Sequence, residues 1–214
     1  MRFTELDVKG AVLIELEPRR DARGFFARAF CAREFGAAGL NPSVVQSNLA
    51  VTDRRGTIRG LHYRVASAME AKVCRCTRGA VYDVLVDLRP ESPTYLRHVG
   101  VELTADNRSA PYIPELCASG YQAPTDDAEV VYDGSGFYAP EHERGVHYDD
   151  PTVGIRWPVP PCDIWAKDSA GPLLPRTDGA RRACPAAMTA DPAAKRCGGG
   201  RVRTASFGSD GQDP

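Results

Sequence analysis

The chain has 214 residues, with 27 basic and 28 acidic side chains, and its formal net charge at pH 7 is -1. This length suits one well-filled core and excludes two full domains. Because acids and bases nearly balance, no overall field would attract nucleic acid or an anionic membrane surface, so we expect neither partner and assign any anionic ligand to a local cluster of charges.

Short runs of β-branched and aromatic residues, broken by glycine, proline and aspartate, follow one another along most of the chain. This pattern is typical of an all-β sandwich or barrel. A short helix is expected over Ala32–Ala38, where the residues permit a helical face and Gly39 would end it. The predicted strands are Gly10–Glu17, Val44–Val51, Ile58–Val65, Ala71–Arg78, Ala80–Leu88, Leu96–Leu103 and Glu129–Tyr132.

The run Ala80–Leu88 has two different faces. Asp83 and Asp87 fall on one side of the predicted strand, because successive side chains alternate. The opposite side carries Tyr82, Val84, Val86 and Leu88. In a closed barrel the acidic side would look into a wet ligand cavity, although a solvated outer face would give the same pattern.

Seven cysteines raise the question of disulfides or a metal site. The first residues lack a charged segment followed by an apolar one, and no apolar run is long enough to cross a bilayer. We therefore expect a cytoplasmic protein with reduced thiols. Cys74 and Cys76 lie two positions apart with no second pair at zinc spacing, so we interpret them as buried thiols rather than metal ligands.

The composition changes after Leu174 to arginine, alanine, glycine, threonine, serine and proline. We therefore divide the chain into a domain over 1–174 and a tail over 175–214. The tail lacks periodic apolar residues and cannot bury enough surface to offset its ordering entropy, so we expect it to be disordered or loosely draped. A nucleic-acid-binding tail is the alternative, but its few arginines are dispersed.

Ten short segments resemble, in the same order, those of the dTDP-4-dehydrorhamnose 3,5-epimerase family. They are Asp21–Phe26 (DARGFF), Gln46–Asn48 (QSN), Arg59–Tyr63 (RGLHY), Glu70–Val73 (EAKV), Arg78–Arg89 (RGAVYDVLVDLR), Ser92–Thr94 (SPT), Ile113–Glu115 (IPE), Phe137–Pro140 (FYAP), Glu143–Gly145 (ERG) and Asp149–Pro151 (DDP). Each is weak alone, but ten in register are specific. The resemblance implies a cupin-type double-stranded β-helix, a jelly-roll barrel with its site in the mouth or lumen. It also implies a homodimer with an N-terminal strand exchanged or added across the interface.

Epimerisation beside a ketone needs a base to remove the α-proton, a cation or hydrogen-bond donor for the enolate oxygen, and an acid on the opposite face. It needs no metal or redox cofactor. By similarity to the family, His62 is the base, Asp168 orients and charges its ring, and Tyr132 is the acid. Histidine titrates near neutrality, and a carboxylate on one ring nitrogen fixes its tautomer, so these residue types suit their roles.

The remaining site residues are also implied by the resemblance. Lys72 and Arg59 are candidate cations for the enolate oxygen or the diphosphate, and Arg23 resembles an arginine that clamps the nucleotide. A plain surface charge is the alternative for each. Tyr138 matches an aromatic that stacks on thymine, unless it is a core aromatic. The other predicted substrate-binding residues are Phe26, Gln46, Asn48, Ser119 and Glu143.

Three positions depart from the family pattern. The family commonly has a second histidine where this chain has Ser119, whose hydroxyl can donate a hydrogen bond but holds no positive charge at neutral pH. This change predicts a slower enzyme or one restricted to a single carbon. Arg28 stands where glutamate is frequent, and Glu70 stands where glutamine is usual, so Glu70 could pair with Lys72 or with Arg28.

Two other functions compete with a cofactor-independent epimerase acting on C3, C5 or both of a dTDP-4-keto-6-deoxyhexose. A metal-dependent cupin would need two histidines one residue apart, then a carboxylate and a histidine. No such spacing is found among His62, His98, His142 and His147. A sugar-nucleotide-binding barrel that has lost its chemistry is suggested by Ser119, but such a protein would gain little from keeping a base and an acid.

Overall fold

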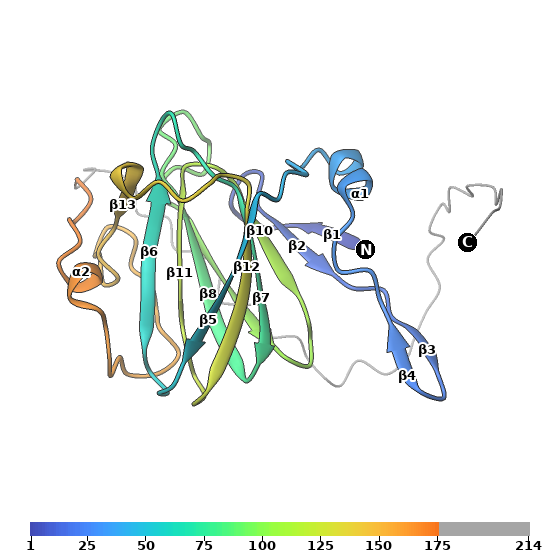
Figure 1. The fold of residues 1–214 in the computed structure, drawn as a ribbon. Helices are drawn as coiled ribbons and strands as arrows, with labels where there is room; N and C mark the ends of the chain where they lie inside the picture. The colour runs from blue at the N-terminus through green and yellow to red at the C-terminus, as the bar shows by residue number, and fades with distance from the viewer. Residues whose placement is uncertain (176–214) are drawn as a thin grey trace, which may run out of the picture.

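The computed structural model describes residues 1–175, so the tail predicted over 175–214 lies outside the described residues except for Pro175. Two antiparallel sheets face each other and roll into a jelly-roll barrel, and a small hairpin extends beside it (Figure 1). The all-β fold class expected from the sequence is therefore confirmed.

The six-stranded sheet contains, in spatial order, β1 (Arg2–Glu5), β2 (Val12–Glu15), β10 (Ala110–Ile113), β7 (Lys72–Arg78), β12 (Ala128–Gly134) and β5 (Gln46–Thr52). The five-stranded sheet contains β13 (Glu143–Gly145), β6 (Ile58–Arg64), β11 (Cys117–Gln122), β8 (Ala80–Asp87) and β9 (His98–Thr104). The hairpin pairs β3 (Arg19–Asp21) with β4 (Gly24–Phe26). The helical elements are α1 (Ala32–Ala37), the 3-10 turn η1 (Pro140–His142) and α2 (Ala166–Ser169).

Each predicted strand run coincides with a strand of the structure, and the predicted helix coincides with α1. This helix ends at Ala37, and Gly39 follows with a φ of 73°, a left-handed value that glycine adopts without strain. Sequence reasoning missed β1, β3, β4, β10, β11 and β13. Pro111 in β10 and Gly120 in β11 interrupt the β-branched alternation that signals a strand, so pairing with neighbouring strands decides their structure.

The main core lies between the two sheets and includes the thiols of β7. Cys74 and Cys76 are buried there, as the sequence predicted, and burial raises the pKa of both thiols. The apolar side chains of the same cluster include Val81, Leu85, Leu103, Ile113 and Val130. The interior is therefore packed at this level of the barrel, and the two sheets hold a fixed separation.

The outer face of the five-stranded sheet is covered by the chain that follows β13, here called the strap (residues 146–174). The cluster between strap and sheet consists of Leu61, Val84, Val86, Ala118, Val146, Val153 and Ile155. β8 is therefore buried on both faces, and a solvated outer face is wrong. The acidic side of β8 faces the interior, but it lines no wet cavity, because Asp83 is 2% exposed and Asp87 is 0% exposed.

The β3–β4 hairpin extends away from the barrel (Figure 1). The Arg23 side chain is 90% exposed and pairs with Asp21 at 2.7 Å, while Phe26 is 72% exposed. These side chains therefore point to solvent within a single chain. Among residues 1–175, none of the helices combines the length and the apolar character needed to cross a bilayer.

Candidate active site

His62 lies on β6, and its ring is held by a carboxylate that comes 106 residues later in the chain, from α2. Nε2 of His62 is 2.7 Å from Oδ1 of Asp168, and the backbone N–H of Gly60 donates to Oδ2 at 3.1 Å. Burial opposes ionisation of Asp168, but the hydrogen bonds from His62 and Gly60 outweigh burial, so the pKa of this carboxyl lies below its usual value. Nδ1 is the ring nitrogen left to face a substrate.

Strands β6 and β11 approach closely beside this histidine. A Cβ on Gly60 would lie 2.6 Å from the Gly120 Cα, and Gly60 has a φ of 115°, so glycine is required there. The register of the two strands sets Ser119 directly opposite His62. Because opposed residues of an antiparallel pair point to the same face, position 119 lies on the face of the sheet that carries the imidazole.

Glu143 approaches the same ring from β13, the edge strand that pairs with β6. Its Oε1 is 3.6 Å from Nδ1 of His62 and accepts a hydrogen bond from Nζ of Lys167 at 2.9 Å. Burial opposes the charge of Glu143, but the contact with Lys167 and the nearby His62 outweigh it, so its pKa is lowered. Sequence reasoning missed Lys167, although it lies next to Asp168 in the chain.

The opposite sheet contributes Lys72 from β7 and Tyr132 from β12. Burial lowers the pKa of Lys72, and the charge of Glu70, 3.9 Å away, offsets part of this effect. Burial raises the pKa of Tyr132, and the charges of Glu70 and Glu143 raise it further. Glu143, which lies 3.6 Å from Nδ1 of His62, is thus among the charges that act on the phenol of Tyr132.

Two amides line the wall next to the phenol. Asn48 lies opposite Tyr132 in the β5–β12 pair, and Gln46 lies one pleat further on the same face. The Asn48 Nδ2 atom is buried, and among the described residues it has no hydrogen-bond partner. A buried donor of this kind is costly unless something binds to it, so Asn48 is suited to contact a ligand.

Arg59 connects the two sheets where β6 and β5 pass each other. Its Nε donates to Oγ1 of Thr52 at 3.0 Å, and its Nη2 donates to the Val51 carbonyl at 2.8 Å. The side chain remains exposed on one side. The structure therefore places this predicted cation on the wall of the barrel, already fixed by two contacts.

The structure does not bring every predicted residue to the histidine. Arg23 and Phe26 lie on the β3–β4 hairpin, which extends away from the barrel (Figure 1). Tyr138 follows β12 at the rim and is 70% exposed, so a core role for it is wrong. The nucleotide-binding residues implied by the resemblance are thus only partly assembled within one chain.

Arg28 and Glu70, the two charged residues that differ from the family pattern, form ion pairs that the sequence predicted only in part. Arg28 forms an ion pair with Glu34 at 2.9 Å, so its proposed pairing with Glu70 is wrong. Glu70 lies 3.9 Å from Lys72, as one alternative predicted, and 3.1 Å from Nε of Arg64. Arg64 had no signal of its own in the sequence beyond its position two residues after His62.

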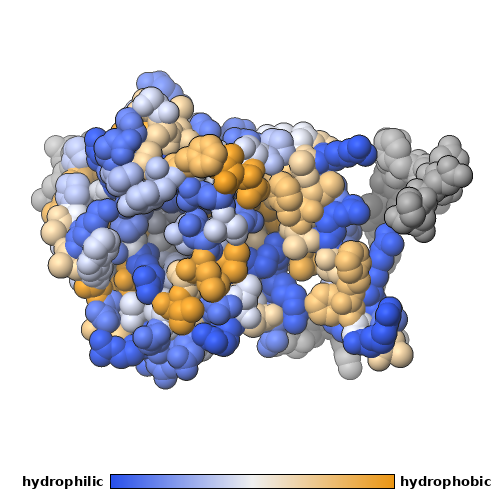
Figure 2. All heavy atoms as spheres, viewed as in Figure 1, coloured by the Kyte–Doolittle hydropathy of each residue, from blue (hydrophilic) through white to orange (hydrophobic). Residues whose placement is uncertain are grey.

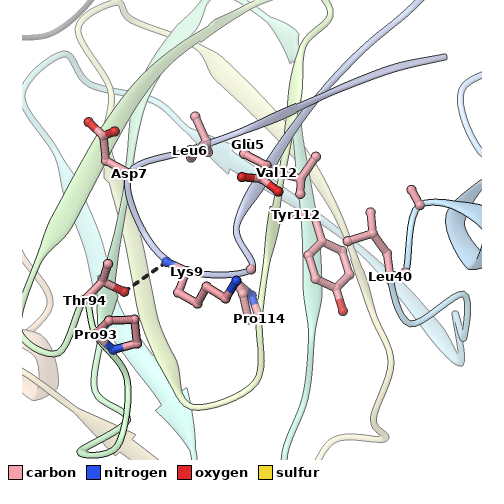
Figure 3. Close-up of a pocket in the computed structure, with 13 residues that line it drawn as sticks. Glu5, Leu6, Asp7, Lys9, Val12, Leu40, Pro93, Thr94, Tyr112 and Pro114 are labelled. Atoms are coloured by element: carbon pink, nitrogen blue, oxygen red, sulfur yellow. Dashed lines mark hydrogen bonds between the residues drawn. The ribbon is translucent and has the colours of Figure 1, made fainter.

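A separate cavity of about 470 Å³ lies between the β1–β2 turn, the end of α1 and β10 (Figure 3). Its wall includes Lys9, whose backbone N–H donates to Oγ1 of Thr94 at 2.9 Å, and the ring of Tyr112. None of the predicted site residues lines it, so the cavity is distinct from the site around His62. Among residues 1–175, no cluster of three metal-binding side chains was found.

Comparisons with known proteins extend this description. A family model described as dTDP-4-dehydrorhamnose 3,5-epimerase matches residues 5–176. A curated protein of that description from Sinorhizobium fredii is 35% identical over 175 residues, covering 81% of this chain and 90% of the relative.

Solved structures are similar in the same way. The 3,5-epimerase from Bacillus anthracis, with TDP and PPi bound, has a TM-score of 0.78 at 34% identity and covers 81% of this chain and 99% of its own. The 3'-monoepimerase from Streptomyces bikiniensis, in complex with dTDP-quinovose, has a TM-score of 0.74 at 35% identity and covers 79% of this chain and 86% of its own. The family-model match spans the site from Gln46 to Asp168.

Proposed function

The chain belongs to the dTDP-4-dehydrorhamnose 3,5-epimerase family, and from this premise we propose how its site works. The protein is an isomerase with a cupin-type fold that epimerises a dTDP-4-keto-6-deoxyhexose in deoxysugar biosynthesis. It inverts C3, C5 or both, the two carbons beside the C4 ketone. The observation that carries the proposal is the His62–Asp168 pair, in which Nε2 lies 2.7 Å from Oδ1, inside a chain segment that matches the family model.

His62 is the base in this mechanism. Nε2 is bound to Asp168, so Nδ1 takes the α-proton, and the carboxylate stabilises the imidazolium that results. Glu143, 3.6 Å from Nδ1, lies close enough to contact the sugar near the same nitrogen. The pair therefore supplies a base of fixed orientation and tautomer.

Lys72 and Tyr132 complete the reaction from the other sheet. The ammonium of Lys72 stabilises the enolate oxygen that forms when the proton leaves. Tyr132 then returns a proton to the opposite face of the carbon, and its raised pKa keeps the phenol protonated at neutral pH. Solvent resets the phenolate and the imidazolium. Arg59, Gln46 and Asn48 line the wall that the substrate contacts.

Solvent deuterium exchange tests this function. The protein is incubated in heavy water with dTDP-4-keto-6-deoxyglucose, and NMR follows deuterium at C3 and C5. We expect labelling at one or both carbons above the enzyme-free control, and a loss of about a hundred- to ten-thousand-fold in His62→Ala and in Tyr132→Phe. Labelling equal to the control would favour a non-catalytic sugar-nucleotide-binding barrel, and undiminished rates in either variant would mean that the wrong residue is assigned.

We also propose that the active form is a homodimer in which the β3–β4 hairpin of one copy reaches the site of the other. The exposed side chains of Arg23 and Phe26 support this, because within residues 1–175 the side chain of Arg23 is 90% exposed and Phe26 is 72% exposed. The edge strand β5 presents apolar side chains outward, with Leu49 62% exposed and Val51 38% exposed. Figure 2 shows apolar side chains gathered on this face of the barrel. A second copy would cover such an edge.

Mixed dimers test the exchange of hairpins. Arg23→Ala and His62→Ala are each expected to be nearly inactive alone. When they are co-expressed, a dimer of one copy of each would combine an intact His62 with an intact Arg23 from its partner. We expect activity to return to about a quarter of the wild-type value, from one complete site in half of the dimers. Activity that stays at the level of the single variants would place Arg23 in the site of its own chain.

A cytoplasmic location is the last part of the proposal. The described cysteines, Cys31, Cys74, Cys76, Cys117 and Cys162, are all free thiols. Free thiols are typical of a reducing compartment.

A further inference from the structure

Arg64 and Glu70 form a buried ion pair beside the catalytic strand. The Arg64 side chain is 8% exposed, the Glu70 side chain is 2% exposed, and Nε lies 3.1 Å from Oε2. Removing two such charges from water has a large desolvation cost, so a buried pair is a poor source of stability by itself. We therefore consider the groups that this ion pair contacts.

The first of these groups is the loop that follows β12. Nη1 of Arg64 donates to the carbonyl oxygen of Phe137 at 2.5 Å. A Cβ on Gly134 would lie 2.1 Å from Oε1 of Glu70, and a Cβ on Gly136 would lie 3.4 Å from Nη1 of Arg64. The backbone of the loop therefore rests directly on the ion pair, and glycines make this approach possible.

The same loop is also fastened to the residue after Glu70. The Ser135 N–H donates to the Ala71 carbonyl at 3.0 Å, and the Ala71 N–H donates to Oγ of Ser135 at 2.9 Å. The loop then presents Tyr138, 70% exposed, at the rim of the barrel. Arg64 and Glu70 thus set the position from which this aromatic ring projects.

The second group is Lys72. Oε2 of Glu70 lies 3.9 Å from Nζ of Lys72, so one carboxylate faces both the arginine under the loop and the lysine of the site. Arg64 is two residues after His62 on β6, and both side chains fall on the same face of that strand. The pair is therefore in contact with the loop and with Lys72, on the strand that carries the base.

We propose that Arg64 and Glu70 are positioning residues that hold the Phe137–Tyr138 loop for the base of the nucleoside diphosphate and tie this loop to Lys72. The inference rests on the proposed function, because it takes Tyr138 as the ring on which the base stacks. Arg64 acts through the loop and does not touch the sugar. Its guanidinium is suited to the task, because the rigid fork forms an ion pair with the Glu70 carboxylate through Nε while Nη1 donates to the Phe137 carbonyl, whereas a lysine would serve one of them.

Binding of dTDP, measured by calorimetry, tests the proposal apart from catalysis. We expect Arg64→Lys and Arg64→Gln to weaken dTDP binding about tenfold, the loss of one charge-assisted hydrogen bond. Glu70→Gln is expected to have a similar effect because it releases the arginine, and Arg64→Gln with Glu70→Gln should be no worse than either alone. Arg75→Gln is the matched control, since its guanidinium also donates to a backbone carbonyl, that of Arg108, on the other side of the sheet. It should keep its dTDP affinity.

The decisive comparison repeats Arg64→Lys in a Tyr138→Ala background. If Arg64 acts by placing this ring, the substitution should change dTDP affinity less than about twofold there. An effect of equal size in both backgrounds, or unchanged affinity in a folded Arg64→Lys protein, would overturn the inference. If Arg64→Gln fails to fold, Arg64→Lys retains the charge and carries the test alone. Absence of dTDP binding by the unaltered protein would instead overturn the proposed function and this inference with it.

Discussion

Replacing Asp83 by asparagine should remove a large pH dependence of stability. Asp83 lies inside the barrel on β8, 2% exposed, and one of its carboxylate oxygens has no hydrogen-bond partner among the described residues. Burial raises the pKa of this carboxyl to about 8, even though the nearby Lys72 lowers it. In the unfolded chain the same group has its ordinary pKa of 3.8. Between these two values the folded protein holds one more proton than the unfolded chain.

The size and sign of the effect follow from that extra proton. Where the folded state binds one more proton, the free energy of unfolding falls by about 1.36 kcal/mol for each unit that the pH rises. The stabilisation is fully present below the unfolded pKa and is lost as the pH approaches the folded value near 8. Between about pH 5 and pH 7, the titration of Asp83 should therefore lower the free energy of unfolding of the wild type by about 3 kcal/mol.

Urea unfolding at several pH values, for wild type and Asp83→Asn, measures this term. Groups that do not interact with Asp83 titrate alike in both proteins, so they cancel in the difference between the two free energies of unfolding. We expect that difference to change by about 3 kcal/mol in favour of the variant between about pH 5 and pH 7. Parallel curves would show that Asp83 is already ionised in the folded protein, as the partner of Lys72, and would refute the reasoning.

Two further substitutions probe the histidine and its neighbours. Ser119→His places an imidazole opposite His62 on the adjacent strand. We expect faster deuterium exchange or a second exchanging carbon, followed by NMR. An unchanged rate and an unchanged labelling pattern would remove position 119 from the mechanism. Asp168→Asn keeps the shape of the contact with Nε2 but cannot stabilise the imidazolium, so kcat should fall by about a hundred- to ten-thousand-fold with KM little changed. A normal kcat in this variant, measured in steady-state assays with bound dTDP as a folding control, would mean that the carboxylate has no part in proton removal.

The sequence predicted the barrel better than it predicted which faces are buried. Alternation along Ala80–Leu88 placed β8 correctly, because the side-chain period of a strand is a local property. It could not show that the strap covers the apolar side, since the strap comes more than fifty residues later and carries its own irregular pattern. Strands β10 and β11 were not predicted for a related reason. Each lies between two other strands of its sheet, and this pairing is not visible in the local sequence.

In the site, too, the sequence predicted individual residues but not the contacts between distant segments. Family-like segments identified His62 and Asp168, and the structure brings them to 2.7 Å across 106 residues of chain. Contacts that depend on several elements had no such signal. Lys167 reaches Glu143 because α2 lies beside β13, and the Arg64–Glu70 pair joins the end of β6 to the segment that leads into β7. Charge pairs of this kind are decided by tertiary packing and not by spacing.

The strap links the packing of the outer face of one sheet to the position of Asp168. Its apolar side chains, such as Val153 and Ile155, cover the back of one sheet, and thirteen residues after Ile155 the same segment delivers Asp168, whose Oδ1 lies 2.7 Å from Nε2 of His62. Damage to this rear covering would misplace Asp168 without altering any group that contacts the sugar. In a selection for turnover, variants scattered over the reverse side of the barrel would be recovered together with those at the catalytic centre.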